Sequence, residues 1–153
     1  MPQILDEKFV RRKIIDYLGR NGWGRNLREK ATDEHGVDIS VWHNNYQRRF
    51  LVEVKGNSKN KITAPRSRME VNFNIALGQI LTRMKVEKAS KHNKYTRKYG
   101  VGFPAIYQDL IFRRLPWAIC DVLNLYIFLV DNNGKVKEFC WRDLKQLQGV
   151  QAK

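Results

Sequence analysis

Three residues of the sequence have side chains that could act together on a phosphate ester: Asp38, Glu53 and Lys55. Hydrolysis of a phosphodiester near neutral pH requires that the negative charge of the scissile phosphate be neutralised. It also requires that the attacking water be made more acidic. Hard divalent cations supply both, and Mg²⁺ prefers one or two carboxylates together with water and substrate phosphate. A nearby lysine amine can orient the attacking water, assist its deprotonation or stabilise the pentacovalent transition state. The three residue types therefore suit metal-assisted hydrolysis.

Two neighbouring strands would have to bring these residues together. Residues 37–42 and 49–55 alternate apolar with other side chains, so each stretch predicts a strand, and residues 43–47 predict a hairpin loop between them. Side chains alternate between the two faces of a strand, so Glu53 and Lys55 are expected on the same face. Because paired strands lie ~4.8 Å apart, one carboxylate from each can reach the same ion.

The acid-x-Lys triplet also has an ordinary interpretation. It occurs three times, beginning at Asp6, Glu53 and Asp143, and in a basic chain such triplets are usually solvated surface pairs. The triplet at Glu53 differs because it lies in a β-branched strand whose hairpin partner also carries an acid, Asp38, and charge is costly there without a purpose. On the residues alone, a metal site and a surface ion pair both remain open.

The rest of the sequence predicts a single α/β domain over residues 1–153, without internal repeats, low-complexity tracts or linkers. Apolar residues at helical spacing predict helices, and alternating or β-branched stretches predict strands. In chain order we expect a helix at 4–21 that ends at Asn21-Gly22, strands at 23–31, 37–42 and 49–55, a helix at 69–84, a strand at 101–105, one helix or two broken at Pro116 within 108–123, a hairpin of strands 125–130 and 136–139, and a helix at 141–147.

The charge of the chain favours a polyanionic partner. Lys and Arg number 29 against 15 Asp and Glu, a formal charge of +14, and residues 1–99 hold 22 of the basic and 10 of the acidic side chains. Basic side chains that neutralise phosphates release condensed counterions, so the excess of positive charge is suited to binding nucleic acid. A basic protein that binds a membrane surface would show the same excess. No apolar run reaches the ~18 residues of a membrane span and the start lacks a signal peptide's apolar region, so we expect a cytoplasmic protein with no membrane partner. Two cysteines are too few for a disulfide scaffold or a structural zinc site.

Two stretches, HGVDISVW at 35–42 and RRFLVEVKG at 48–56, resemble the PD-(D/E)XK nuclease superfamily. The likeness extends over about residues 4–106, because the predicted order of elements is similar to a restriction-endonuclease-like core, as in archaeal Holliday junction resolvases. The expected fold class is therefore α/β, with a mixed β-sheet flanked by helices. Val37 stands where the family motif has Pro, which makes the motif less specific.

The resemblance assigns roles to Asp38 and to the residues of the triplet at Glu53. It implies that Asp38 and Glu53 bind a catalytic Mg²⁺, for which Mn²⁺ can substitute, and that the backbone carbonyl of Val54 is a further ligand. It also implies that Lys55 assists hydrolysis.

Three further positions match the family pattern more loosely. Glu7 corresponds to an acid of the first helix that contacts a metal-bound water, and Gln79 to a glutamine in the helix after the triplet. Arg83, one helical turn later, would extend the same rim. The alternatives are a helix N-terminal acid favoured by the dipole for Glu7 and a boundary residue beside the core for Gln79.

Contacts to nucleic acid are expected from two basic loops that flank this helix. Such residues suit phosphates, which position a nucleic acid without reading its sequence. With Arg83, the candidate residues are Arg66, Arg68, Lys88, Lys91, Lys94, Arg97 and Lys98.

The leading hypothesis is a Mg²⁺-dependent endonuclease that acts on DNA. Specificity for a DNA structure, as in junction resolvases, is one form of this hypothesis. One alternative is a non-catalytic nucleic-acid-binding module on a nuclease-like fold, and another is a basic domain that binds protein. Because cutting two strands takes two sites, and resolvase-like relatives work as dimers, a homodimer is expected.

Overall fold

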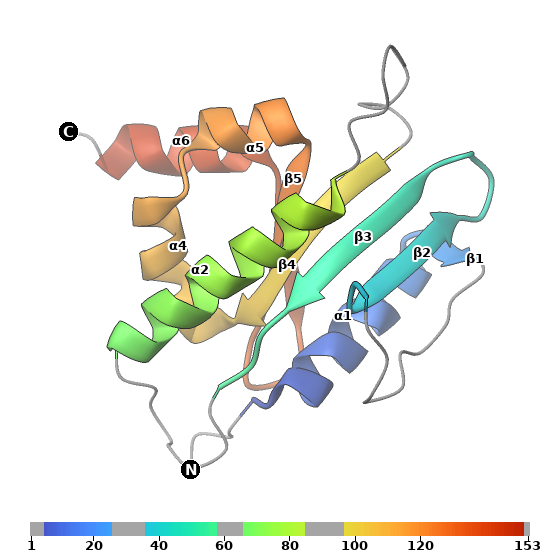
Figure 1. The fold of residues 1–153 in the computed structure, drawn as a ribbon, viewed down its shortest axis with the longest axis horizontal. Helices are drawn as coiled ribbons and strands as arrows, with labels where there is room; N and C mark the ends of the chain where they lie inside the picture. The colour runs from blue at the N-terminus through green and yellow to red at the C-terminus, as the bar shows by residue number, and fades with distance from the viewer. Residues whose placement is uncertain (1–4, 26–35, 58–65, 85–96, 152–153) are drawn as a thin grey trace.

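The computed structural model describes residues 5–25, 36–57, 66–84 and 97–151. Six strands in these ranges form one mixed sheet in the order β1-β2-β3-β4-β5-β6, and five α-helices flank it (Figure 1). In chain order the elements are α1 (Glu7–Arg20), β1 (Trp23–Arg25), β2 (Ile39–His43), β3 (Arg49–Val54), α2 (Arg66–Arg83), β4 (Arg97–Pro104), the 3₁₀ turn η1 (Ala105–Tyr107), α4 (Gln108–Arg114), α5 (Trp117–Leu123), β5 (Leu125–Val130), β6 (Val136–Phe139) and α6 (Trp141–Gln151).

The sheet has a parallel centre between antiparallel hairpins. β2 and β3 form an antiparallel hairpin next to β1, and β5 and β6 form another at the opposite edge. β3, β4 and β5 run parallel to one another. Parallel neighbours need a crossover connection, which α2 provides between β3 and β4, and which η1, α4 and α5 provide between β4 and β5.

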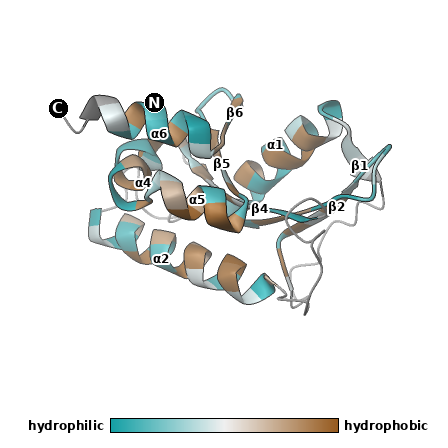
Figure 2. Cartoon of the chain, turned by 90° about the horizontal axis from the view of Figure 1, so that it is seen from above, coloured by the Kyte–Doolittle hydropathy of each residue, from teal (hydrophilic) through white to brown (hydrophobic). Residues whose placement is uncertain are grey.

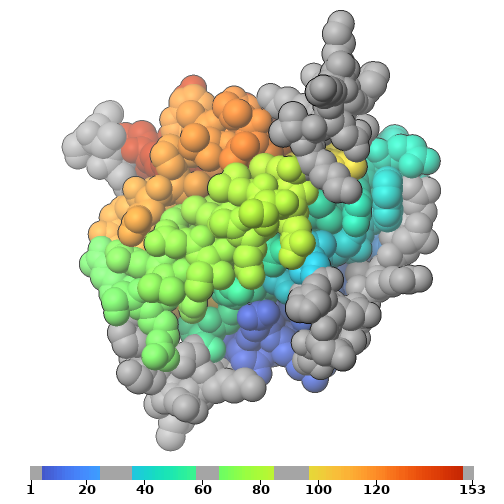
Figure 3. Space-filling model, viewed as in Figure 1, coloured from blue at the N-terminus to red at the C-terminus, as the bar shows by residue number. Residues whose placement is uncertain are grey.

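Helices cover both faces of the sheet (Figure 2). α1 packs on one face, where Ile14 and Leu18 join Phe50 and Val52 of β3 in an apolar core. α2, α4, α5 and α6 pack on the other face around a second core, and the outer sides of α2 and α5 lie next to each other in Figure 3. Leu51 belongs to this second core, so side chains of β3 alternate between the two layers as expected. Within the described ranges no helix is long and apolar enough to cross a membrane.

The predicted fold class is confirmed: the chain is an α/β protein with a mixed sheet flanked by helices, compatible with a restriction-endonuclease-like core. The order of elements agrees as well, including two short helices on either side of Pro116. The first helix ends at Arg20, where the amide of Asn21 donates to carbonyls of the last turn, and Gly22 adopts a positive φ of 87°.

Two elements begin earlier in the chain than predicted. α2 begins at Arg66 rather than Met69, and β4 begins at Arg97 rather than Val101. β4 extends backwards because its first residues pair with both neighbouring strands, Arg97 with Arg49 of β3 and Tyr99 with Leu125 of β5. Such pairing joins segments far apart in sequence, so a local sequence pattern does not predict it. The strand expected at 23–31 is described only as far as Arg25.

Candidate active site

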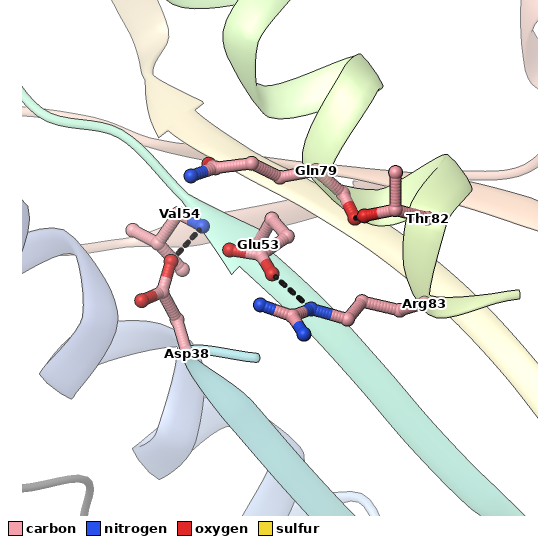
Figure 4. Close-up of polar contacts among 6 residues, drawn as sticks. All are labelled: Asp38, Glu53, Val54, Gln79, Thr82 and Arg83. Atoms are coloured by element: carbon pink, nitrogen blue, oxygen red, sulfur yellow. Dashed lines mark hydrogen bonds and ion pairs between the residues drawn. The ribbon is translucent and has the colours of Figure 1, made fainter. Parts of the chain in front are cut away.

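Asp38 is held at the start of the β2–β3 hairpin. It lies one residue before β2 rather than inside it, and the first pair of the hairpin joins Ile39 to Val52. Continuing this antiparallel register places Asp38 beside Glu53 of β3. The Asp38 side chain is buried and accepts a 2.8 Å hydrogen bond from the backbone amide of Val54 (Figure 4).

Glu53 is buried on the face of β3 that α2 covers. It is 2% exposed, and its Oε1 lies 3.5 Å from Nε of Arg83 in the last turn of α2 (Figure 4). The pKa of Glu53 is raised to about 7, first by burial and then by the hydrogen bond and negative charge of Asp38, while Arg83 opposes the shift. The acid pair therefore keeps a proton near neutral pH unless more positive charge is brought to it.

Lys55 continues the pairing of β3 by one residue. Its backbone amide donates a 2.9 Å hydrogen bond to the carbonyl of Gly102 in β4, and the residue is half-buried. Because the strand geometry continues, alternation predicts the Lys55 side chain on the face of Glu53. The Cβ atoms of Lys55 and Glu53 would then lie about 7 Å apart along the strand.

The start of α1 lies directly against the chain that follows Lys55. A Cβ on Gly56 would lie 2.1 Å from the backbone nitrogen of Glu7, and the amide of Asn57 donates a 2.7 Å hydrogen bond to the carbonyl of Leu5. Asp6 caps the helix by accepting from the amide of Phe9. The fold therefore brings the backbone of Glu7 to the end of β3.

Asn57 is a neighbour of this junction that the sequence did not single out. Its Oδ1 is buried and has no hydrogen-bond partner in the described structure. The one sequence signal is its place two residues after Lys55, at the end of a strand.

Gln79 and Arg83 lie one turn apart on the side of α2 that faces the end of β3 (Figure 4). Oε1 of Gln79 and Nε of Arg83 are both buried, and neither has a hydrogen-bond partner among the described residues. Thr82, on the exposed side, donates instead to the backbone carbonyl of Gln79. The site thus contains polar atoms from α2 that are available for further hydrogen bonds.

Arg66 and Arg68 do not lie in a loop, which corrects the sequence-based expectation. They form the exposed first turn of α2, while Arg83 forms its last turn. At 1.5 Å per residue the two ends of the helix are about 25 Å apart. Arg66 and Arg68 therefore lie far from Glu53, although both are accessible to a long ligand.

Arg97 and Lys98 also lie in a strand rather than in the expected basic loop. Lys98 pairs with Phe50, so its side chain is on the α1 side of the sheet, opposite to Glu53. Its Nζ lies 4.6 Å from the ring centroid of Tyr126 and 5.5 Å from that of Trp23, and burial lowers its pKa. The positive charge of Lys98 is tolerated at this strand position because the faces of the aromatic rings attract its ammonium group. The remaining candidates, Lys88, Lys91 and Lys94, lie outside the described residues.

The oxygen atoms at this site fit a hard divalent cation. Asp38 and Glu53 supply carboxylate oxygens, and Oε1 of Glu53 is buried without a hydrogen-bond partner. Mg²⁺ and Mn²⁺ favour one or two carboxylates completed by carbonyl and water oxygens. No group of three or more His, Cys, Asp and Glu side chains suited to a metal occurs in the described ranges, so any ion here would depend on the acid pair and on backbone or water oxygens.

The fold is similar to two solved structures. One is an XisH family protein from Nostoc punctiforme, with a TM-score of 0.51 and 16% identity over 86% of this chain and 98% of that one. The other is an FdxN element excision controlling factor protein from Anabaena variabilis, with a TM-score of 0.52 and 18% identity over 85% of this chain and 96% of that one. At these identities the likeness concerns the fold alone. No protein-family model matches the sequence, and no curated protein does.

Proposed function

We propose that this protein is a Mg²⁺-dependent endonuclease that hydrolyses DNA phosphodiester bonds. The observation that carries the proposal is the pair of buried acids, Asp38 just before β2 and Glu53 in β3, where the pKa of Glu53 is raised to about 7. Two neighbouring carboxyl groups out of contact with water cost stability. Strongly perturbed acids in such a pair are typical of sites that bind a cation or transfer a proton.

Asp38, Glu53 and the backbone carbonyl of Val54 would hold the ion, as the resemblance to the nuclease superfamily implies. When bound, Mg²⁺ would neutralise charge at the phosphate and make its water more acidic. The hydrogen bond from the amide of Val54 orients the Asp38 carboxylate relative to the strand that carries Glu53. The chain itself therefore arranges the oxygen ligands.

Other side chains of the site would act on water and phosphate. An amine at Lys55, on the face of Glu53, would orient the attacking water and stabilise charge that develops on the phosphate. Oε1 of Gln79 is buried without a hydrogen-bond partner and would accept a hydrogen bond from the same water. Glu7, at the end of β3, would contact a water bound to the ion.

The charge of the chain supports a nucleic acid as the substrate. A formal charge of +14 in 153 residues favours a polyanion, and the binding should weaken steeply with salt because counterions are released. Arg83 lies at the acid pair and is 39% exposed, so it is placed to contact a phosphate there.

One observation favours the second candidate, a nucleic-acid-binding module that does not cut. The guanidinium group of Arg83 already places positive charge 3.5 Å from Glu53, so an internal cation occupies part of the space that a metal would use. If this ion pair were permanent, the site would be structural, and the basic surface would bind nucleic acid without hydrolysis.

A cleavage assay separates the two candidates. Labelled linear, branched and single-stranded DNA is incubated with the protein in Mg²⁺, Mn²⁺ or EDTA, next to the variants Glu53→Gln and Lys55→Met. We expect metal-dependent cleavage that both variants lose while they still bind DNA. Binding without cleavage of every substrate by the unaltered protein would favour the non-catalytic module.

We also propose that two copies associate through the outer sides of α2 and α5. Residues 71–82 of α2 contain no charged side chain, although 29% of the whole chain is charged. A copy carrying +14 can approach another copy most easily through an uncharged surface. The exposed apolar side chains of α2 and α5 are Val71, Ile75, Leu81, Ile119 and Val122.

A further inference from the structure

Arg83 forms an ion pair with the buried acid Glu53. It lies in the last turn of α2, with Nε 3.5 Å from Oε1 of Glu53. Figure 4 shows its guanidinium group directed towards the side of Glu53 on which Asp38 lies. A cation shared by Asp38 and Glu53 would approach the same carboxylate oxygens.

The contact between Arg83 and Glu53 is an ion pair without a hydrogen bond. Charge-assisted hydrogen bonds are about 2.7–2.9 Å long, whereas these atoms are 3.5 Å apart. Both Nε of Arg83 and Oε1 of Glu53 are buried and have no hydrogen-bond partner in the described structure. A buried pair needs good hydrogen-bond geometry to offset desolvation, so this pair is easier to separate than a bidentate one.

Arg83 and a divalent cation would compete for the carboxylates of Asp38 and Glu53, because both carry positive charge and both need the same space. One guanidinium carries half the charge needed to neutralise two carboxylates, whereas a divalent cation matches them. A bound Mg²⁺ lies about 2.1 Å from its oxygen ligands, so the unmoved guanidinium would be next to it with the same sign of charge. The Arg83 side chain is 39% exposed, so it has a path to solvent.

We infer that Arg83 is a displaceable internal counter-ion of Glu53, which competes with the divalent cation and contacts a DNA phosphate once it is displaced. This inference rests on the proposed function. In the metal-free protein Arg83 compensates part of the buried negative charge. When the cation replaces it, the guanidinium group gains a new partner only if a phosphate is present, so cation and DNA should strengthen each other's binding.

Calorimetric titration of DNA-free protein with Mn²⁺ at pH 8 tests the competition. Arg83→Met removes the charge and keeps an apolar stem, and we expect it to bind Mn²⁺ about tenfold more tightly than the unaltered protein. Arg114→Met is the matched control, because Arg114 forms a similar pair, 3.4 Å from Glu70, and is 43% exposed. It removes the same net charge and should leave Mn²⁺ affinity unchanged. Arg83→Lys keeps a positive charge and should bind Mn²⁺ less tightly than Arg83→Met.

The outcomes separate this inference from the proposed function. Glu53→Gln should abolish Mn²⁺ binding in both backgrounds, and thermal unfolding shows whether each variant is folded. If folded Arg83→Met binds Mn²⁺ no more tightly than the unaltered protein, and binding still requires Glu53, the counter-ion role is overturned and the metal site stands. If neither protein binds Mn²⁺, the metal-dependent function is overturned together with the inference. Weaker DNA binding by Arg83→Met than by Arg114→Met would support the phosphate contact, and equal binding would overturn it.

Discussion

Asp38 accepts a 2.8 Å hydrogen bond from the backbone amide of Val54, the residue between Glu53 and Lys55. This bond joins the start of β2 to the end of β3, and it orients one acid of the buried pair relative to the strand that carries the other. A buried amide without a partner costs free energy, so the Asp38 carboxylate contributes to stability as well as to the proposed cation site. The two contributions can be separated by substitution.

Asp38→Ala should destabilise the fold, whereas Asp38→Asn should mainly affect the cation. Alanine leaves the Val54 amide without an acceptor and should lower the free energy of unfolding by about 1–3 kcal/mol. Asparagine keeps an acceptor oxygen and loses the charge, so stability should change less while Mn²⁺ affinity falls at least tenfold. Urea unfolding at pH 5, where Glu53 holds its proton, and calorimetry at pH 8 measure the two effects. Equal stability of the alanine variant and the unaltered protein would contradict the role of the hydrogen bond.

Stability should fall as pH rises from about 4.5 to about 7 in EDTA, because the pKa of Glu53 is raised from 4.5 to about 7 in the folded protein. Across this range the folded state binds more protons at Glu53 than the unfolded chain, so the free energy of unfolding decreases with pH. The expected loss from this one group is roughly 2–3 kcal/mol by pH 8.

Glu53→Gln is the control for this pH dependence, because glutamine has nearly the same shape and does not titrate. The difference in unfolding free energy between the variant and the unaltered protein should grow from pH 5 to pH 8 in favour of the variant. Urea unfolding at both pH values measures it. Parallel pH profiles for the two proteins would show that Glu53 titrates normally.

The local part of the site could be predicted from the sequence because it depends on one hairpin. Period-two alternation separates Glu53 from Val54, and the short loop between the strands sets which residues pair, so Asp38 and Glu53 are brought together by neighbours in sequence. Amphipathic spacing likewise predicts the helices that flank the sheet.

The parts that depend on distant segments could not be predicted in this way. The family resemblance placed Arg83 on the rim of the site, but its contact with Glu53 depends on how α2 packs on β3, which no spacing rule within the helix specifies. Lys98 looks like part of a basic loop, but it pairs with Phe50 of β3, and rings from three strands surround its amine. Charge alone did not distinguish a strand residue over aromatic rings from a solvated one.

Gly56→Ala should loosen the junction between β3 and α1. The new Cβ would lie 2.1 Å from the backbone nitrogen of Glu7, and a backbone atom cannot turn away as a flexible side chain can. We expect a loss of at least about 2 kcal/mol in the free energy of unfolding and weaker Mn²⁺ binding, because the end of β3 must shift. Gly149→Ala is the control, since nothing lies within 4 Å of its Cβ position in α6, and it should be neutral or stabilising. Equal unfolding curves for the two variants would contradict the close approach.

Val122→Glu should prevent association of two copies if the outer sides of α2 and α5 form the interface. Val122 is 74% exposed on α5, and a carboxylate there would be desolvated against an apolar surface that offers it no charged partner from residues 71–82. Tyr46→Glu is the control, because Tyr46 is an exposed apolar residue in the β2–β3 loop, on another part of the surface. Light scattering coupled to size-exclusion chromatography should give a dimer of about 36 kDa for the unaltered protein and Tyr46→Glu, twice the 18.1 kDa chain, and a monomer for Val122→Glu. A monomeric unaltered protein at the concentrations used for cleavage would contradict the dimer, and a dimer that persists in Val122→Glu would place the interface on a different face.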